Sequence, residues 1–449
     1  MLLLIRKASL MGFFAAFLAL AGNASAQPFR PGATKQPTQD TSPSAQHYNR
    51  GLAYFQKGDL KAARAELDAA IKLDKERPAY YNTRGLILLS LGEPKLAAED
   101  FTEADRLNPN HAEILNNRGD AWRDAGEPEK ALADFTAAIE LHPEKAEYYN
   151  NRGHLYLTAL RDPAKAVADF DRAIQLDKSN VYAYLNRGNA WRNQNEFDKA
   201  LADYHAVIKL DPKHSGAYKN RGDVWLQKGR FDKALADYNQ ALKLEPQYMD
   251  ARYARGWTHR ELGRYEAAVT DLSEVVKAYP EHLLARLERG RSYVGLKQYD
   301  RALADLNEVL RLNPEFAAGF YHRGLAHHGA GEYAKAITDY AAAIRLAPQI
   351  PDAYNDLAWL LATCPDPKIR NGKTALRSAQ KACELAESPS WRFFDTLAAS
   401  YAAAGEFAQA VETQKEAIAL AETEADQAQL RQRLKLYEEQ KPYHDPPQQ

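Results

Sequence analysis

One short motif recurs along this chain at almost constant spacing and limits what the chain can fold into. An Arg-Gly pair returns every 34 residues, with a single spacing of 35 between Gly153 and Gly188. The pairs are Arg50-Gly51, Arg84-Gly85, Arg118-Gly119, Arg152-Gly153, Arg187-Gly188, Arg221-Gly222, Arg255-Gly256, Arg289-Gly290 and Arg323-Gly324. A period of this length is typical of helix-turn-helix units that stack side by side. The sequence therefore predicts one repeat array rather than several globular domains.

The segment 112–145 shows how one repeat is built. Its first half carries Gly119 and Trp122 within an apolar stripe at helical spacing, and its second half carries Phe135 in another such stripe. The sequence Gly126-Glu127-Pro128 separates them, because glycine can adopt positive φ and proline can only begin the next helix. Small residues such as Gly119 allow the two helices to approach closely, while the aromatic rings fill the space between hairpins.

This pattern resembles the consensus of the tetratricopeptide repeat (TPR) family position by position, and the export signal described below resembles the exported bacterial type. The resemblance implies an all-α, right-handed α-solenoid of about 11 TPR helix-turn-helix repeats with a C-terminal capping helix. It also implies a protein that binds other proteins or peptides and is not an enzyme. The stretch 355–442 further resembles a terminal block that recurs in bacterial TPR proteins.

The repeat register divides the chain into five parts. The tenth repeat lacks the Arg-Gly pair and carries about five extra residues near Cys364 to Gly372, and the eleventh begins near Trp391. A final amphipathic helix from about Asp426 to Glu439 closes the array, since the last apolar face needs a cover. The predicted parts are a signal peptide (1–26), a disordered linker (27–43), nine regular repeats (44–350), two atypical repeats (351–424), and a capping helix with a polar tail (425–449).

The arginine of each Arg-Gly pair lies on the stripe that should be buried, so it needs a partner. An acidic residue recurs sixteen positions after most of these arginines, as Asp134 does after Arg118. The midpoint between these two residues is Gly126, the turn residue, so both lie at equal height in an antiparallel hairpin. We expect an arginine-carboxylate pair within each hairpin or between neighbours, as a structural ladder that sets the register.

A second, polar stripe runs beside the buried one on the first helix of each repeat. In TPR proteins this face lines a concave groove, and the asparagines here resemble those that clamp an extended peptide backbone. An amide can both donate to and accept from a passing peptide unit. The candidate partner-binding residues are Asn49, Asn82, Asn116, Asn117, Asn150, Asn151, Asn186, Asn189 and Asn220. The alternative is that they are merely solvated helix positions; in both cases we expect them to face solvent.

The same stripe changes character in the C-terminal half of the array. It carries Trp257, Arg260, Glu288, Arg291 and His328 in place of asparagines. Charged and aromatic side chains discriminate between ligands more strongly than amides do. Any preference for a particular partner sequence is therefore expected in this half.

Other chemistry finds little support in the sequence. His322, His327 and His328 are poorly spaced for a metal site, and no motif for catalysis, phosphate binding or any cofactor is recognisable. With 59 basic and 60 acidic residues, the formal charge of −1 gives no general attraction for nucleic acid or anionic lipid. The only cysteines, Cys364 and Cys383, fall in the tenth repeat; they either form a disulfide or fill small apolar spaces.

The sequence predicts a protein-protein interaction scaffold that binds extended segments of partner proteins in a concave groove. The alternative is a structural adaptor, or an accessory subunit of an envelope or export assembly, that contacts folded partners through its convex face. The groove requires amides that line a channel. The adaptor requires apolar patches on the outer helices.

The first residues resemble an export signal, with Arg6 and Lys7 before an apolar run from Leu10 to Leu20 and small residues at Ala24 and Ala26. The apolar run falls short of the roughly 20 residues that a permanent membrane span needs. We therefore expect a periplasmic or secreted protein without membrane insertion after cleavage; an uncleaved membrane anchor is the alternative.

If the signal is cleaved after Ala26, the mature chain begins at Gln27. N-terminal sequencing of protein purified from an envelope or secreted fraction tests this prediction. A chain that begins at Met1 would contradict cleavage.

Overall fold

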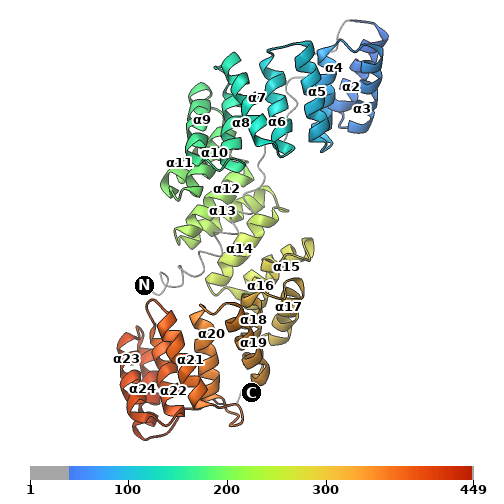
Figure 1. Cartoon of the computed structure of the whole chain (residues 1–449). Coiled ribbons are helices and arrows are strands. Elements are labelled where there is room, and N and C mark those ends of the chain that lie inside the picture. The colour runs from blue at the N-terminus through green and yellow to red at the C-terminus, as the bar shows by residue number, and fades with distance from the viewer. Residues whose placement is uncertain (1–39, 447–449) are drawn as a thin grey trace. The chain divides into compact units, whose positions relative to one another are not determined.

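The computed structural model describes residues 40–446, in which 23 α-helices and no strand occur. The predicted signal peptide and most of the predicted linker lie outside these residues. The described residues divide into an N-terminal unit, 40–246, and a C-terminal unit, 247–446 (Figure 1). The helices of the N-terminal unit are α2 (Pro43–Gln56), α3 (Leu60–Leu73), α4 (Pro78–Ser90), α5 (Pro94–Leu107), α6 (Ala112–Asp124), α7 (Pro128–Leu141), α8 (Ala146–Thr158), α9 (Pro163–Leu176), α10 (Val181–Asn193), α11 (Phe197–Leu210), α12 (Ser215–Gln227) and α13 (Phe231–Leu244). The C-terminal unit contains α14 (Met249–Glu261), α15 (Tyr265–Ala278), α16 (Leu283–Gly295), α17 (Tyr299–Leu312), α18 (Ala317–Gly329), α19 (Tyr333–Leu346), α20 (Pro351–Thr363), α21 (Gly372–Leu385), α22 (Trp391–Ala403), α23 (Phe407–Leu420) and α24 (Glu424–Glu438).

Consecutive helices pair into hairpins, and within each unit every hairpin packs against the next. Even-numbered helices from α2 to α22 form the first half of each hairpin and are called A helices here. Odd-numbered helices from α3 to α23 form the second half and are called B helices. α24 packs against the last B helix. This arrangement confirms the predicted all-α solenoid. No described helix is both long and apolar enough to cross a membrane.

The turn between the A and B helices uses left-handed backbone conformation. Gly126 has φ 78°, and glycine holds the equivalent place in most repeats. Asn195 and Lys297 take that place with φ 59° and 58°. A β-carbon is sterically disfavoured in this conformation, so glycine is the most frequent residue at this turn position.

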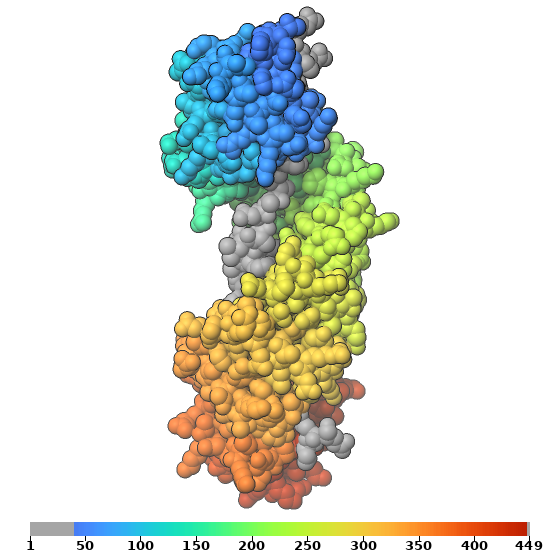
Figure 2. All heavy atoms as spheres, turned by 90° about the vertical axis from the view of Figure 1, so that its right-hand side faces the viewer, coloured from blue at the N-terminus to red at the C-terminus, as the bar shows by residue number. Residues whose placement is uncertain are grey.

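Each hairpin is closed by an aromatic or leucine side chain of the B helix that packs on the glycine of the Arg-Gly pair. A β-carbon added to Gly119 would lie only 2.7 Å from the Phe135 ring. Tyr204 covers Gly188 in the same way, and both rings are fully buried. In the space-filling view, the atoms of the blue to cyan hairpins form one continuous surface (Figure 2). The glycine is thus required by close packing, since any larger residue would push the helices apart.

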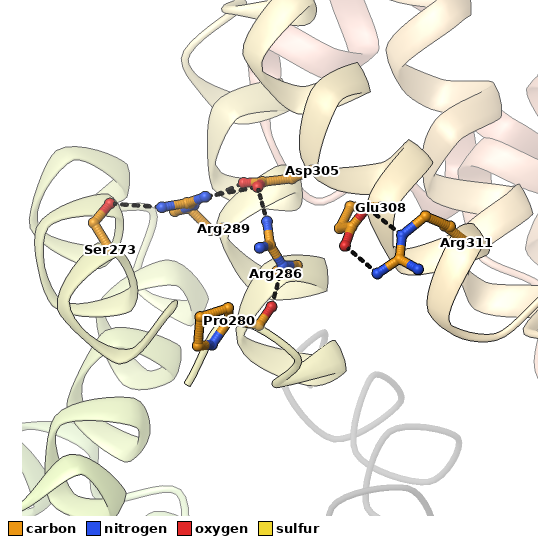
Figure 3. A network of polar contacts seen from close by, with 7 residues as sticks. All are labelled: Ser273, Pro280, Arg286, Arg289, Asp305, Glu308 and Arg311. Atoms are coloured by element: carbon orange, nitrogen blue, oxygen red, sulfur yellow. Dashed lines mark hydrogen bonds and ion pairs between the residues drawn. The ribbon is translucent and has the colours of Figure 1, made fainter. Parts of the chain in front are cut away.

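The arginine of each Arg-Gly pair forms the predicted ion pair within its own hairpin. Figure 3 shows one example, in which Arg289 on α16 faces Asp305 on α17. Its Nε and Nη2 atoms donate to the two carboxylate oxygens, each at 2.7 Å, and its Nη1 donates to Ser273 on the preceding B helix at 3.2 Å. One guanidinium therefore joins two helices of its own repeat to the repeat before it.

The same bidentate geometry recurs through both units, which confirms the predicted ladder. The first repeat is the exception, because a glutamate replaces the aspartate and Arg50 meets only one oxygen of Glu66, at 3.1 Å. The remaining pairs are Arg84–Asp100, Arg118–Asp134, Arg152–Asp169, Arg187–Asp203, Arg221–Asp237, Arg255–Asp271 and Arg323–Asp339.

Apart from the exposed pair of the first repeat, these pairs are largely removed from water. Asp134 is buried, and 17% of the Arg118 side chain is exposed. The hydrogen bonds to Asp134 raise the pKa of Arg118, so the guanidinium stays charged at any ordinary pH. Arg118 also pairs with Asp105 of the preceding repeat at 3.1 Å. Most of the donors of the guanidinium are thus satisfied by protein groups.

The end of the C-terminal unit departs from the regular pattern. The chain between α20 and α21 runs from Cys364 to Asn371, where the sequence predicts the insertion. Asp395 on α22 binds Arg433 of α24 through two hydrogen bonds of 2.9 Å. The segment after α24 turns back and lies against α20, where Asp445 meets Thr363. The last helix is therefore held by an ion pair and by the chain that follows it.

Replacing Asp134 with Ala should lower the free energy of unfolding by about 3 kcal/mol, because it leaves a mostly buried guanidinium short of its main partner. Adding Arg118→Leu to the same chain should recover much of this loss, since no unpaired charge remains. Urea unfolding followed by circular dichroism measures both. Glu308→Ala, which breaks an exposed pair with Arg311, is the control and should cost less than about 1 kcal/mol. Equal midpoints for the single and double variants would contradict the argument.

Candidate functional site

The asparagines of the polar stripe bond to one another across neighbouring A helices of the N-terminal unit. In each case the side-chain nitrogen of one repeat donates to the side-chain oxygen of the preceding repeat. These bonds, called rungs here, are Asn117 to Asn82 at 3.2 Å, and Asn151 to Asn116, Asn186 to Asn150 and Asn220 to Asn189 at 3.1 Å each. They connect α4, α6, α8, α10 and α12 in a continuous series.

Half of these amides do not face solvent, which corrects the expectation from sequence. Asn116, Asn150, Asn151 and Asn186 are buried, with exposed fractions of 2% to 7%. The reason is the close spacing of successive A helices, which lets a stripe residue of one helix reach the next. A buried amide must be hydrogen-bonded, and the rungs meet this requirement.

The remaining stripe asparagines keep access to the surface. Asn82, Asn117, Asn189 and Asn220 are partly exposed, as is Asn49 on α2. A primary amide has two N–H groups and two oxygen lone pairs, whereas one rung uses one N–H of the donor and one lone pair of the acceptor. The rungs thus fix the orientation of each amide without using all of its hydrogen-bonding capacity.

The rungs lead into a buried ion network on α10 and α12 that the sequence analysis did not identify. Asp223 is fully buried and accepts hydrogen bonds from Arg192 at 3.2 Å and from the Tyr238 hydroxyl at 3.0 Å. Lys219, one turn earlier, lies 2.9 Å from the same carboxylate. Burial and the nearby carboxylate raise the pKa of Tyr238 well above its ordinary value, so its hydroxyl remains a donor. The only sequence signal was the shared place of Arg192, Lys219 and Asp223 on the polar stripe.

A second carboxylate lies beside the rungs on α6. Asp120 accepts a hydrogen bond from Arg123 at 2.6 Å and a longer one from Asn151 at 3.4 Å. Burial raises the pKa of Asp120 to about 6, with Arg123 opposing the shift. Burial also lowers the pKa of His154 to about 4, so that ring is neutral near pH 7. The centre of the stripe is therefore rich in hydrogen bonds and poor in free charge.

In the C-terminal unit the stripe consists of paired charges. Arg260 pairs with Glu288 of the next A helix and with Glu261, and its guanidinium lies 5.4 Å from the centre of the Trp257 ring. Arg291 donates to Glu288 at 3.0 Å. The charges are thus compensated within the stripe, between two A helices for Arg260 and Glu288 and within α16 for Arg291 and Glu288.

The cysteines and histidines named from sequence do not form a shared site. Cys364 is buried at the end of α20, whereas Cys383 lies half-buried on α21 with its sulfur 4.0 Å from the Phe393 carbonyl oxygen. Both thiols are free in the structure, and burial raises the pKa of Cys383 to about 11. His327 pairs with Glu332, and burial lowers the pKa of His322. Within residues 40–446 no cluster of His, Cys, Asp or Glu could hold a metal ion.

The different burial of the rungs predicts that they contribute unequally to the stability of the fold. Asn151→Ala leaves the buried oxygen of Asn116 without its donor and should lower the free energy of unfolding by about 2 kcal/mol. Asn117→Ala removes the donor to the side-chain oxygen of Asn82, which water can reach. It should therefore lower the free energy of unfolding by less than about 1 kcal/mol. Urea unfolding of the two variants measures the difference, and equal losses would contradict the burial argument.

Comparison with known proteins identifies the repeat. The tetratricopeptide repeat family matches the chain over residues 48–112, 82–146, 116–181, 155–215, 185–248, 222–282, 253–293 and 287–351. No curated protein sequence matches the chain.

Among solved structures, a tetratricopeptide repeat protein from Parabacteroides merdae is 22% identical, covers 56% of this chain and 98% of its own, and has a TM-score of 0.47. Yeast Tom70 is 16% identical, with coverages of 88% and 96% and a TM-score of 0.41. YrrB, described as a TPR protein with an unusual peptide-binding site, is 25% identical, with coverages of 42% and 97% and a TM-score of 0.34. Because the family matches span residues 48–351, well over half of the 449 residues, this chain belongs to the tetratricopeptide repeat family.

Proposed function

We propose that this protein is a scaffold that binds extended segments of partner proteins along the asparagine stripe of its N-terminal unit. The observation that carries the proposal is the series of rungs, which holds neighbouring amides in fixed orientation and leaves part of their hydrogen-bonding capacity unused. An extended peptide offers alternating N–H and C=O groups that match such amides whatever its side chains are. The proposed recognition is therefore tolerant of partner sequence.

The exposure of these asparagines supports two proposed roles. Asn82, Asn117, Asn189 and Asn220 are partly exposed and would contact the partner. The buried asparagines, Asn116, Asn150, Asn151 and Asn186, bond to one another and would hold successive A helices at a fixed spacing, while the exposed amides are oriented by their own rungs. Orientation before binding lowers the entropy lost on binding, which favours affinity.

The alternative, an adaptor that uses its outer helices, has less support. Several large apolar side chains are exposed on the B helices, and Leu73, Leu141, Leu210 and Leu420 are each the last residue of such a helix. These are single residues at helix ends, and isolated exposed apolar residues are ordinary on protein surfaces. We therefore favour the A-helix stripe as the binding surface.

Export and a non-catalytic role complete the proposal. Residues 1–26 support delivery to the periplasm or the exterior, where the array would act within an envelope or export assembly. The TPR fold and the absence of a recognisable catalytic motif in the sequence support binding without chemistry.

The binding surface can be tested by removing its exposed amides together. Asn82→Ala, Asn117→Ala and Asn220→Ala in one chain should weaken binding of a peptide selected from a displayed library of short unstructured peptides by about tenfold or more, since each lost hydrogen bond is worth roughly 0.5–1.5 kcal/mol. Asn189 is kept because it also accepts a 2.8 Å hydrogen bond from the buried Tyr204. Fluorescence anisotropy measures the affinity.

The control is Asn108→Ala, which removes an exposed amide at the end of α5, away from the stripe. It should leave peptide affinity unchanged. Circular dichroism melting should show nearly wild-type stability for both variants. A triple variant that folds and keeps full affinity would rule out the stripe as the binding surface.

A further inference from the structure

We propose that helices α20 and α24 form a second peptide-binding site, specific for an aromatic residue followed two positions later by a carboxylate, and that the chain's own tail occupies it. The tail is defined here as residues 442–446, the last described residues after α24. Tyr443 and Asp445 of the tail contact α20 and α24. This site belongs to the C-terminal unit and does not depend on the asparagine stripe.

The main chain of the tail binds the end of a helix. The backbone N–H of Asp445 donates to the carbonyl oxygen of Thr363 at 2.8 Å. Thr363 is the last residue of α20, and carbonyls in the last turn of a helix lack a partner within the helix. The helix end thus offers an acceptor that any extended peptide backbone can use.

The carboxylate of Asp445 is recognised by two side-chain donors. Its Oδ2 atom accepts from the indole nitrogen of Trp359 at 2.8 Å and from the hydroxyl of Thr363 at 2.6 Å. Hydrogen bonds to an ionised acceptor are stronger than neutral ones. Because an indole N–H can only donate, an acceptor is required at this position of the ligand.

The aromatic ring of Tyr443 packs against a second ring and a cation. Its centre lies 6.0 Å from the centre of the Trp359 ring and 5.3 Å from the guanidinium of Arg433, which also lies 5.6 Å from Trp359. Arg433 is held by the bidentate ion pair with the buried Asp395. The groups that contact the tail are thus held in position by residues outside the tail.

The tail has the features of a bound peptide more than those of a packed element. It has no helix or turn, and its binding residues alternate, with Tyr443 and Asp445 engaged and His444 exposed between them. Binding sites for extended peptides commonly contact alternate side chains in this way. Pro442 and Pro446 flank the pair, and proline restricts the unbound backbone, which lowers the entropy lost on binding.

A partner segment with the same pattern would compete with the tail for this site. The tail is attached directly after α24, so its effective concentration at the site is high, on the order of millimolar. A partner must therefore displace the tail to bind, and weakly binding ligands are excluded from the site. The expected partner is an extended segment with an aromatic residue and, two positions later, an aspartate or glutamate.

The test uses the full chain with Tyr443→Ala and Asp445→Ala, and as probe a labelled synthetic peptide that copies residues 441–447. The double variant should bind the peptide at least about tenfold more tightly than the wild-type chain, whose site is filled. Adding Trp359→Phe to the double variant should reverse most of this gain, because the indole donor is lost. Fluorescence anisotropy measures all three.

Control peptides and a control variant separate recognition of the peptide from effects on the stability of the protein. A peptide with alanine in place of His444 should bind as well as the original, and one with alanine in place of Tyr443 and Asp445 should not bind. If the double variant is unstable, the single variant Asp445→Asn is used in its place. The peptide should then raise the melting temperature of this single variant. A folded variant that does not bind the peptide, or that binds the doubly substituted peptide equally well, would overturn the proposal.

Discussion

The fold depends on a guanidinium that meets a carboxylate inside each hairpin and reaches back to the hairpin before it. Arg289 shows all of these contacts at once, with Asp305 on the same hairpin and Ser273 on the preceding one (Figure 3). A mostly buried ion pair is stable only if both partners are present and well oriented. Each repeat therefore sets the register of its neighbour as well as its own, which is the coupling that a linear array needs to unfold cooperatively.

Periodicity and symmetry predicted much of this architecture from sequence. Arg118 and Asp134 lie symmetrically about Gly126, so their pairing follows from the geometry of an antiparallel hairpin alone. The neighbours of Asn151 did not follow, because they depend on the offset between successive hairpins, and its burial was missed for this reason. The contact of Asp445 with Trp359 spans 86 positions and belongs to no period, so nothing local could have indicated it.

The two units place different chemistry on the same face of their A helices. In the N-terminal unit neutral amides bond to one another, and the fully buried Asp223 is matched by Arg192 and Lys219. In the C-terminal unit the equivalent positions hold ion pairs and indole rings. In both units a polar group on one A helix bonds to the next A helix, through the rungs in the first and through Arg260 and Glu288 in the second. Any ligand must accordingly exchange with existing hydrogen bonds or use the capacity they leave over.

The single 35-residue spacing shows how this architecture tolerates a change in length. Arg152 and Asp169 are 17 positions apart instead of 16, yet both hydrogen bonds remain at 2.8 Å. The added residue is absorbed near the turn, where Arg161 takes up the left-handed conformation with φ 52°. The turns between paired helices are thus places where the chain can take up an extra residue while the ladder survives. Evolution can lengthen these loops without redesigning the stack, and an epitope or fluorescent label could be inserted there on the same grounds.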